Sequence, residues 1–416
     1  MIASELVRKM TKQPFIICLC LIAMLGAVTG SIHGGDFFFI KDQIIQNAWL
    51  RTSMFYIAPS LRLNNLGYNT NIYSYEYLET PDWTANIRLD LNVSAILKDR
   101  LIIQVKESPF YAMYKDTDRE RAFNNILQMT AYTWIGRLNL KYQFEKPYLY
   151  QQANPETGQR LRRWETLHFF SMDYGNQRRF FISIYGRTRS VSYEDKPYLG
   201  SYNLNAMFTR TEYWGGININ RVIFSRTRLT LGFDYYDHRY RYIPMRDGTG
   251  SQVFVAVQFP AGSRVSGTLR YGLRFIRPLS SLYRNFVKPY GSGLISFRLM
   301  DRINLNINYQ MDNRYSFSGA DIYYDSQAIG GGFTFAFTPR IHLTSSVSTG
   351  QRLYKSLLTE GQLRRDTFNI YRVLLSTRIG NKGETGVEYR AFRADSTQLR
   401  FVRSYDYIGG YISYDF

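Results

Sequence analysis

Hydrophobic and polar residues alternate with a period of two from about residue 50 to the C-terminus. In segment 303–310, Ile, Leu, Ile and Tyr share one side, and three Asn and a Gln share the other. Segments 85–95, 138–145 and 265–275 repeat this alternation. Because successive side chains of a strand point to opposite faces, the pattern predicts strands with one apolar and one polar face. No long stretch has a helical period, and no repeat of solenoid length is present.

Eighteen segments of this kind follow one another along the chain. Their predicted spans are 50–64, 82–97, 100–114, 125–135, 137–149, 161–173, 179–193, 211–223, 228–240, 251–260, 264–276, 290–300, 303–311, 327–338, 341–351, 367–379, 384–394 and 404–416.

The connections between these segments alternate in length. Short ones lie near 98–100, 175–178, 261–263, 300–302, 339–340 and 381–383, and longer polar ones lie between them. Tight turns at one end and long loops at the other are typical of outer-membrane barrels. The sequence therefore predicts an all-β fold, a transmembrane antiparallel up-and-down β-barrel of about 18 strands with short periplasmic turns and longer extracellular loops.

A soluble antiparallel sheet would alternate in the same way, so other features must decide. The polar face is rich in Asn, Ser, Thr and Arg, as expected for a wet lumen. The 35 Tyr and 28 Phe often lie near strand ends, where barrels carry aromatic girdles. Since only helices and closed barrels can cross a bilayer and no apolar run beyond residue 30 is long enough for a helix, we favour the membrane barrel.

The N-terminus has the layout of a secretory signal peptide. Arg8, Lys9 and Lys12 precede an apolar stretch over 15–28, and small residues follow at 29–31. We expect cleavage near residue 30, which divides the chain into a signal peptide (1–30), a short periplasmic segment (31–49) and the barrel (50–416). An uncleaved membrane anchor is the alternative. Both cysteines, Cys18 and Cys20, fall in the signal segment, so we expect a mature chain without disulfide or lipid anchor.

The last strand resembles the C-terminal signal strand of Gram-negative outer-membrane proteins, which the assembly machinery recognises. Ile408, Gly410, Ile412, Tyr414 and Phe416 fall on one face of it. This resemblance implies that the five residues form an assembly signal, and that the assembly machinery is a partner.

The net charge of +19 arises from 52 Lys and Arg against 33 Asp and Glu. Basic proteins often bind nucleic acid, but the basic residues here are scattered in or beside loops and form no nucleic-acid motif. We expect them to meet outer-membrane lipid, lipopolysaccharide or surface polysaccharide, because anionic membrane surfaces attract Lys and Arg.

Candidate catalytic groups are few. His342 and Ser346 share a strand face, and Asp321 and Asp325 lie in one long loop. Barrel hydrolases require a nucleophile beside a base, yet a polar pair in the lumen or a solvated rim accounts equally for these residues. No metal-spaced His or Cys cluster and no phosphate-binding glycine loop appears. We therefore expect no enzyme activity, no metal site and no cofactor.

Charged side chains of the polar face are the candidate site. If the alternation holds, Arg and Lys outnumber Asp and Glu there, and rings of charge set pore selectivity. This predicts a mild preference for anions or acidic saccharides, whereas the alternative is that the charges pair across strands and only stiffen the wall. The predicted lumen residues are Arg88, Asp90, Lys141, Glu145, Asp234, Arg270, Arg274, Arg298, Arg372, Arg378, Glu388 and Arg390.

Three short stretches, 66–73, 107–111 and 119–124, resemble the type 2 family of β-barrel porins of Gram-negative outer membranes. The resemblance covers mainly residues 50–150. It implies a barrel in the outer membrane and a link to exopolysaccharide or exosortase systems, but no defined substrate.

Together these observations predict a porin-like channel that passes small hydrophilic solutes passively or assists polysaccharide export. The rival is a non-conducting barrel, closed by inward loops, that serves as a structural or surface-binding component of an envelope assembly. Loops 65–81 and 194–210 are the longest candidates to fold inward. The tyrosines of the first, Tyr68, Tyr73, Tyr75 and Tyr77, would either stack on sugar rings or pack the loop against the wall.

Overall fold

The computed structural model describes residues 35–75, 79–152, 160–193, 198–199, 202–224, 227–260, 264–281, 283–316, 323–354 and 364–416. The predicted signal peptide lies outside these residues, as does Tyr77.

Strands make up most of the described chain. They are β1 (Leu50–Arg51), β2 (Phe55–Asn69), β3 (Asp82–Leu97), β4 (Leu101–Glu107), β5 (Phe110–Tyr114), β6 (Ala122–Ile135), β7 (Leu138–Gln152), β8 (Arg160–Asn176), β9 (Phe180–Tyr193), β10 (Tyr198–Leu199), β11 (Tyr202–Asn203), β12 (Arg210–Ile223), β13 (Thr227–Tyr240), β14 (Gly248–Phe259), β15 (Val265–Pro278), β16 (Phe286–Met300), β17 (Ile303–Tyr315), β18 (Tyr323–Ala336), β19 (Ile341–Tyr354), β20 (Arg365–Ile379), β21 (Gly383–Ser396) and β22 (Arg403–Asp415). The helical elements are α3 (Gly35–Asn47), α4 (Leu204–Phe208), η2 (Asp118–Glu120), η3 (Pro244–Arg246) and η4 (Leu399–Phe401).

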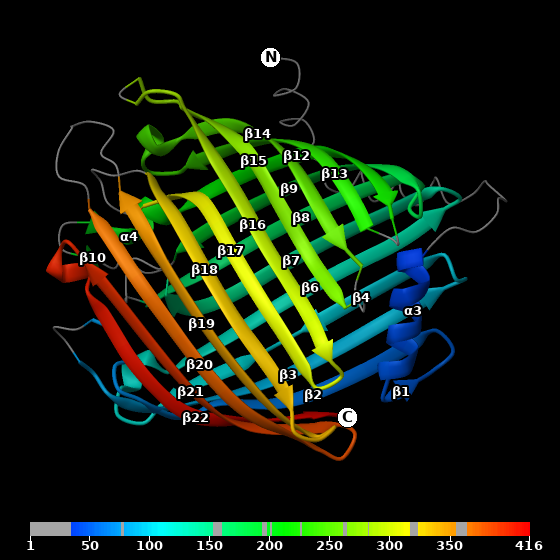
Figure 1. Ribbon diagram of the computed structural model, residues 1–416, viewed down its shortest axis with the longest axis horizontal. Coiled ribbons are helices and arrows are strands. Elements are labelled where there is room, and N and C mark those ends of the chain that lie inside the picture. The colour runs from blue at the N-terminus through cyan, green and yellow to red at the C-terminus, as the bar shows by residue number, and fades with distance from the viewer. Residues whose placement is uncertain are drawn as a thin grey trace.

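The long strands form one closed antiparallel barrel (Figure 1). Each pairs with its neighbours in chain order, and β22 pairs back with β2 to close the wall. β4 and β5 share one place, because both pair with β3 on one side and β6 on the other. The wall therefore has eighteen positions, which confirms the predicted fold class. Within the described residues, closure leaves none of these wall strands with an unpaired edge.

Most predicted strands match the observed ones within a few residues, but the first is wrong at its start. Residues 50–51 form the short strand β1, a turn follows, and the wall begins with β2 at Phe55. β1 pairs only with the beginning of β2. The alternation before residue 55 therefore belongs to a hairpin at the barrel's short-turn end.

The two faces of the wall differ as the alternation predicts. On β13, Leu231 is 56% exposed on the outer face, whereas Asp234 is 1% exposed on the inner face. Exposed Leu, Ile, Val, Phe and Tyr side chains recur at alternate positions around the outside. An apolar exterior of this kind suits lipid, while the inner face carries most of the charged side chains.

A β-bulge interrupts β2 at Asn65, whose φ is 51°. The extra residue reverses the alternation. Leu63 and Leu66 are three residues apart, yet both pair with residues of the outer face of β22. Two hydrogen bonds hold the bulge: Thr84 Oγ1 donates to Asn65 O at 3.0 Å, and Arg390 Nη2 donates to Asn65 Oδ1 at 2.7 Å. The bulge thus turns an asparagine toward the charged inner face.

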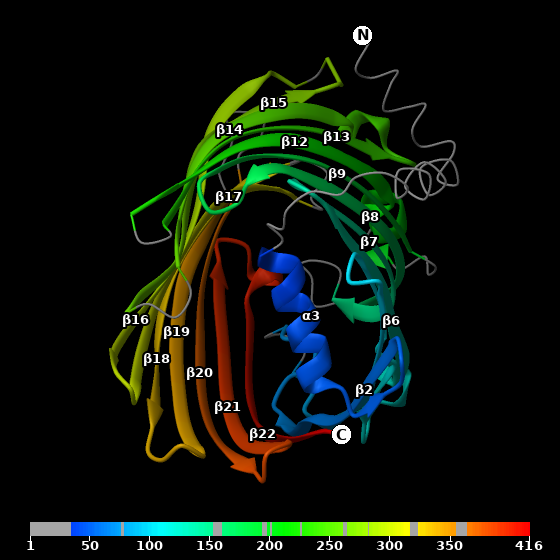
Figure 2. The same ribbon diagram turned by 90° about the vertical axis from the view of Figure 1, so that its right-hand side faces the viewer.

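The segment before the barrel wall, for which the sequence predicted no secondary structure, contains a helix. Helix α3 lies within the ring of strands, at the short-turn end (Figure 2). Phe37, Ile40 and Ile44 follow the helical i, i+3, i+7 spacing, and Phe37 and Ile44 are buried against the wall. Within the described ranges, no helix is both long and apolar enough to traverse a bilayer.

Candidate functional site

The inner wall near the closing seam carries an excess of cations. Asp90 on β3 is 1% exposed, and three cationic groups approach it: Arg88 Nε at 2.9 Å, Arg62 Nε at 3.5 Å and Lys106 Nζ at 3.9 Å. The Ser108 hydroxyl also donates to it. One buried carboxylate cannot neutralise three cations, so this part of the wall stays positive.

A second group lies on the other side of the seam. Glu388 on β21 accepts from Arg372 Nε at 2.5 Å and lies 3.2 Å from Arg390 Nε. The bond from Arg390 to Asn65 on β2 crosses the seam and links the two groups. We call both together the seam cluster; it comprises Arg62, Arg88, Asp90, Lys106, Arg372, Glu388 and Arg390.

The cations of the seam cluster remain accessible from the lumen. Their side chains are 29–47% exposed, whereas the two carboxylates are 1% and 13% exposed. Five cations thus stand against two largely buried carboxylates. The arrangement leaves guanidinium and ammonium N–H groups free to meet an anion, which accepts charge-assisted hydrogen bonds.

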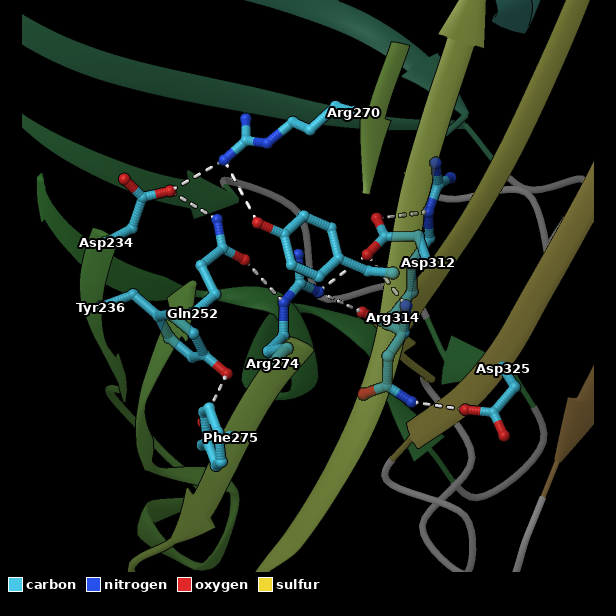
Figure 3. Close-up of polar contacts among 11 residues, drawn as sticks. Asp234, Tyr236, Gln252, Arg270, Arg274, Phe275, Asp312, Arg314 and Asp325 are labelled. Atoms are coloured by element: carbon cyan, nitrogen blue, oxygen red, sulfur yellow. Dashed lines mark hydrogen bonds and ion pairs between the residues drawn. The ribbon is translucent and has the colours of Figure 1, made fainter. Parts of the chain in front are cut away.

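A different network spans the facing wall, and Figure 3 shows its polar contacts. Asp234 on β13 accepts from Gln252 Nε2 at 2.5 Å, from Arg270 Nη2 at 3.0 Å and from the Tyr185 hydroxyl. Arg274 then donates to Gln252 Oε1 at 3.0 Å. A buried carboxylate with three donors is held in a fixed position, because each donor replaces a lost water.

The same network continues toward the long loops. Arg274 Nη1 lies 2.7 Å from Asp312 Oδ1, and Arg314 Nε lies 3.5 Å from Asp312 Oδ2. Lys288 Nζ lies 2.8 Å from Asp325 Oδ2. We call this set the β13–β18 network; it comprises Asp234, Gln252, Arg270, Arg274, Lys288, Asp312, Arg314 and Asp325.

Aromatic rings support the arginines of this network. Arg270 lies 3.5 Å from the centroid of Phe254, and Arg274 lies 4.9 Å from that of Tyr290. Both rings are buried. Cation–π contact and local carboxylates together compensate the charge of these guanidinium groups, so the network is a nearly neutral part of the wall.

The remaining predicted lumen residues lie apart from both sets. Lys141 on β7 lies 5.5 Å from the ring centroid of Tyr132 and 5.7 Å from that of Phe169. Glu145 accepts from Gln128 and Gln143 at 3.0 and 2.6 Å. Arg298 and Arg378 lie beside the short turns, where their backbone N–H groups donate to the carbonyl oxygens of Arg264 and Arg340, the residues that precede β15 and β19.

Several charged residues of the inner wall were not among the predicted lumen residues. Arg62 and Lys288 lie between apolar residues and Lys106 follows Val105, so the same alternation could have placed all three on the polar face. A further group on β8, β9 and β12 gathers around two buried carboxylates near the long-loop end: Arg163 and Arg189 on Glu165, and Arg210 on Glu212.

Both long loops expected to fold inward contribute buried residues. Leu204, Met207 and Phe208 of α4 form one hydrophobic cluster with Phe401 of η4. The connections that carry α4 and η4 leave the wall on nearly opposite sides. Arg246 adds a bond to Met207 O at 3.4 Å, and another to Ser316 O. Loops from several sides therefore meet over the long-loop mouth.

The tyrosines of the first long loop pack inward and do not line a free surface. Tyr73 and Tyr75 are buried, with Ile72 and Tyr114, in one cluster. The Tyr73 hydroxyl donates to Glu120 at 2.8 Å. Burial raises the pKa of Tyr73, and the Glu120 carboxylate raises it further, so the hydroxyl keeps its proton. Tyr68 instead contacts the exposed Trp83 ring.

The candidate catalytic residues are not brought together. In register, His342 pairs with Ser376 and Ser346 pairs with Arg372. Asp325 is an acceptor for Lys288 and Asn313, and Asp321 lies outside the described residues. No group of three potential metal ligands occurs in the portion of the chain that the structure describes.

Solved structures of other proteins share this barrel architecture. OccK2 (OpdF) of Pseudomonas aeruginosa, in complex with glucuronate, superposes with a TM-score of 0.50 at 13% identity, over 86% of this chain and 97% of that one. The same protein without that ligand gives 0.51 at 12% identity, with the same coverage. The chain has the fold of an outer-membrane porin.

This shared fold confirms the predicted resemblance to outer-membrane β-barrel porins at the level of architecture. The outer-membrane protein OpdK of P. aeruginosa is also similar, with a TM-score of 0.49 at 11% identity over 86% of this chain and 98% of that one. No protein-family model matches the chain, and no curated protein matches it either.

Proposed function

We propose that this porin-fold protein is an integral outer-membrane channel that passes small hydrophilic solutes passively and prefers anions. The observation that carries the proposal is the seam cluster, where five partly exposed cations face two buried carboxylates. Charged side chains that line a pore select against ions of the same sign. A solute carboxylate would gain hydrogen bonds there without displacing a protein carboxylate.

The exterior and the last strand support the membrane location. Ile408, Ile412 and Tyr414 are exposed on the outer face of β22, where the lipid would lie, and Phe416 directly after the strand is exposed as well. The proposed partners are outer-membrane lipid, lipopolysaccharide and the assembly machinery that would read this strand; surface polysaccharide is a further one. No chemical step, cofactor or nucleic acid enters the proposal. The link to exopolysaccharide export stays a prediction from the family resemblance.

A second candidate is the non-conducting barrel. It is favoured by the cluster of α4 with η4, in which loops from nearly opposite sides of the wall meet. If this cluster seals the mouth, the protein would serve as a structural or surface-binding component of the envelope. The two candidates share every feature of the wall and differ only in whether ions cross it.

Conductance of the purified protein in a planar bilayer, under a KCl gradient, tests the proposal. We expect stable single-channel steps whose reversal potential lies closer to the equilibrium potential of chloride than to that of potassium. We also expect added glucuronate, the ligand in the OccK2 complex, to block the current. Steps without ion preference would refute the role of the seam cluster. Silence from protein shown to be folded by its heat-modifiable gel mobility would favour the closed barrel.

A further inference from the structure

Helix α3 lies in the path that a solute would take through the short-turn end of the barrel (Figure 2). Phe37 and Ile44 are buried against Ile96 of β3 and Ile102 of β4, with Trp134 of β6 beside them. These wall residues face inward, on the same side as the charged lumen residues. The helix therefore rests on the inner surface of the wall and takes up part of the mouth.

Among the residues that the structure describes, the contacts that hold α3 come from one side of the helix. Lys41 Nζ lies 2.8 Å from Asp99 Oδ1, in the turn between β3 and β4. Trp134 Nε1 donates to Asp99 O at 3.3 Å and fixes that turn. On the opposite side of the helix, Asp42, Gln43 and Gln46 are exposed. A helix that packs against the wall on one face and is exposed to solvent on the other can separate from the wall as a unit.

The wall does not depend on α3. Strands β2 to β22 close the barrel through their own pairings. The chain returns from the helix to the wall through β1, where Trp49 N donates to Ile57 O at 2.9 Å and Thr52 N donates to Phe55 O at 2.9 Å. This short hairpin tethers the helix, so displacement of α3 would break no hydrogen bond between wall strands.

We propose that α3 is a tethered gate that narrows the short-turn mouth when it is seated on Ile96 and Ile102, and widens it when it swings away on the β1 hairpin. The gate rests on the proposed channel function, because it controls the same path. Its apolar seat favours the closed position, since unseating exposes Phe37 and Ile44 to water.

The gate is tested by placing a charge in its seat. Ile44→Asp buries an unpaired carboxylate against Ile96 and Ile102, which is unfavourable, so the helix should unseat. Gln43→Asp adds the same charge to the adjacent exposed position and is the matched control. An α-helix is about 10 Å across, so we expect I44D to raise the single-channel conductance about twofold or more, and Q43D to leave it unchanged.

A cross-link tests the closed state independently. The double variant Lys41→Cys/Asp99→Cys is produced by export, so that the predicted signal segment with both native cysteines is removed. A bis-maleimide with a disulfide in its linker adds one cysteine thiol to each maleimide and should hold α3 seated until a reductant cleaves the linker. We expect low, quiet conductance after cross-linking and a rise after the reagent is cleaved. Gel mobility confirms folding of every variant.

The outcomes separate the gate from the channel. If wild type conducts and neither I44D nor cleavage of the cross-link changes the conductance, the gate is refuted while the channel stands. If wild type is silent but I44D conducts, the gate is supported and the resting barrel is closed by its helix. If all folded variants are silent, both the gate and the channel are refuted.

Discussion

The seam cluster and the β13–β18 network use the same residue types on the inner wall, yet they differ in how far carboxylates compensate their cations. The seam cluster has five cations for two carboxylates, whereas the β13–β18 network has four cations for three. The cations of the β13–β18 network are 14–38% exposed, and those of the seam cluster are 29–47% exposed. In the proposed channel, a lumen arginine would contact solute only where its local carboxylates leave it unsatisfied. We therefore expect the ratio of charges, and not their number, to mark the wall that a solute meets.

The largest expected difference between the two regions concerns solute binding. Arg62→Gln/Arg372→Gln/Arg390→Gln removes three accessible charges, and we expect glucuronate block to weaken about tenfold, which corresponds to about 1.4 kcal/mol. The matched variant is Arg270→Gln/Arg274→Gln/Lys288→Gln in the β13–β18 network. It should weaken block less than about twofold, because these three cations already pair with Asp234, Asp312 and Asp325 and leave little charge for a solute.

Both triple variants are compared by single-channel block near 1 M KCl, where the Debye length of about 3 Å leaves only side chains in contact with the solute to act. Equal weakening by the two variants would erase the distinction between the walls. Unchanged block in the seam variant would place the solute path elsewhere.

Substitution of the two buried carboxylates is expected to affect stability more than solute block. Asp234→Asn should lower the free energy of unfolding by about 1–3 kcal/mol, because a charge-assisted acceptor of three hydrogen bonds is lost and the buried donors are left poorly satisfied. Asp90→Asn should cost less, since its cationic partners are 29–45% exposed and water can solvate them.

Urea unfolding of the two Asn variants in detergent, followed by loss of heat-modifiable gel mobility, provides the comparison. Asp90→Asn should also shift the reversal potential further toward the equilibrium potential of chloride, because it removes a negative charge from the positive wall. A D234N protein as stable as wild type would show that the β13–β18 network is not a stiffening device.

The sequence was sufficient for the architecture of both regions but not for the difference between them. Alternation placed Arg88, Asp234, Arg274 and Arg390 on the same face, because period two depends only on the strand itself. Which carboxylate each cation meets depends on register and on reach across the wall. Arg274 of β15, for example, contacts Asp312 of β17, beyond the intervening strand. A single strand carries no information on that distance.

Two departures from period two were present in the sequence and have physical causes. Leu63 and Leu66 lie three apart because the bulge at Asn65 inserts one residue. Phe37, Ile40 and Ile44 carry a helical period over only 13 residues, and isolated helices of that length are marginal in water. The helix is stabilised by its seat on Ile96 and Ile102, so the inner wall, not its own propensity, decides its fold.

The smallest expected effect comes from Lys141, which belongs to neither region. Its ammonium group lies over Tyr132 and Phe169, and cation–π contacts of this kind contribute about 0.5–1 kcal/mol. Lys141→Gln should therefore lower stability slightly in urea and leave glucuronate block nearly unchanged, since the rings already satisfy the charge. If K141Q instead weakened block as much as a seam substitution, a cation whose charge is compensated locally would still bind solute. The position of a cation along the solute path would then predict its effect on block better than local compensation does.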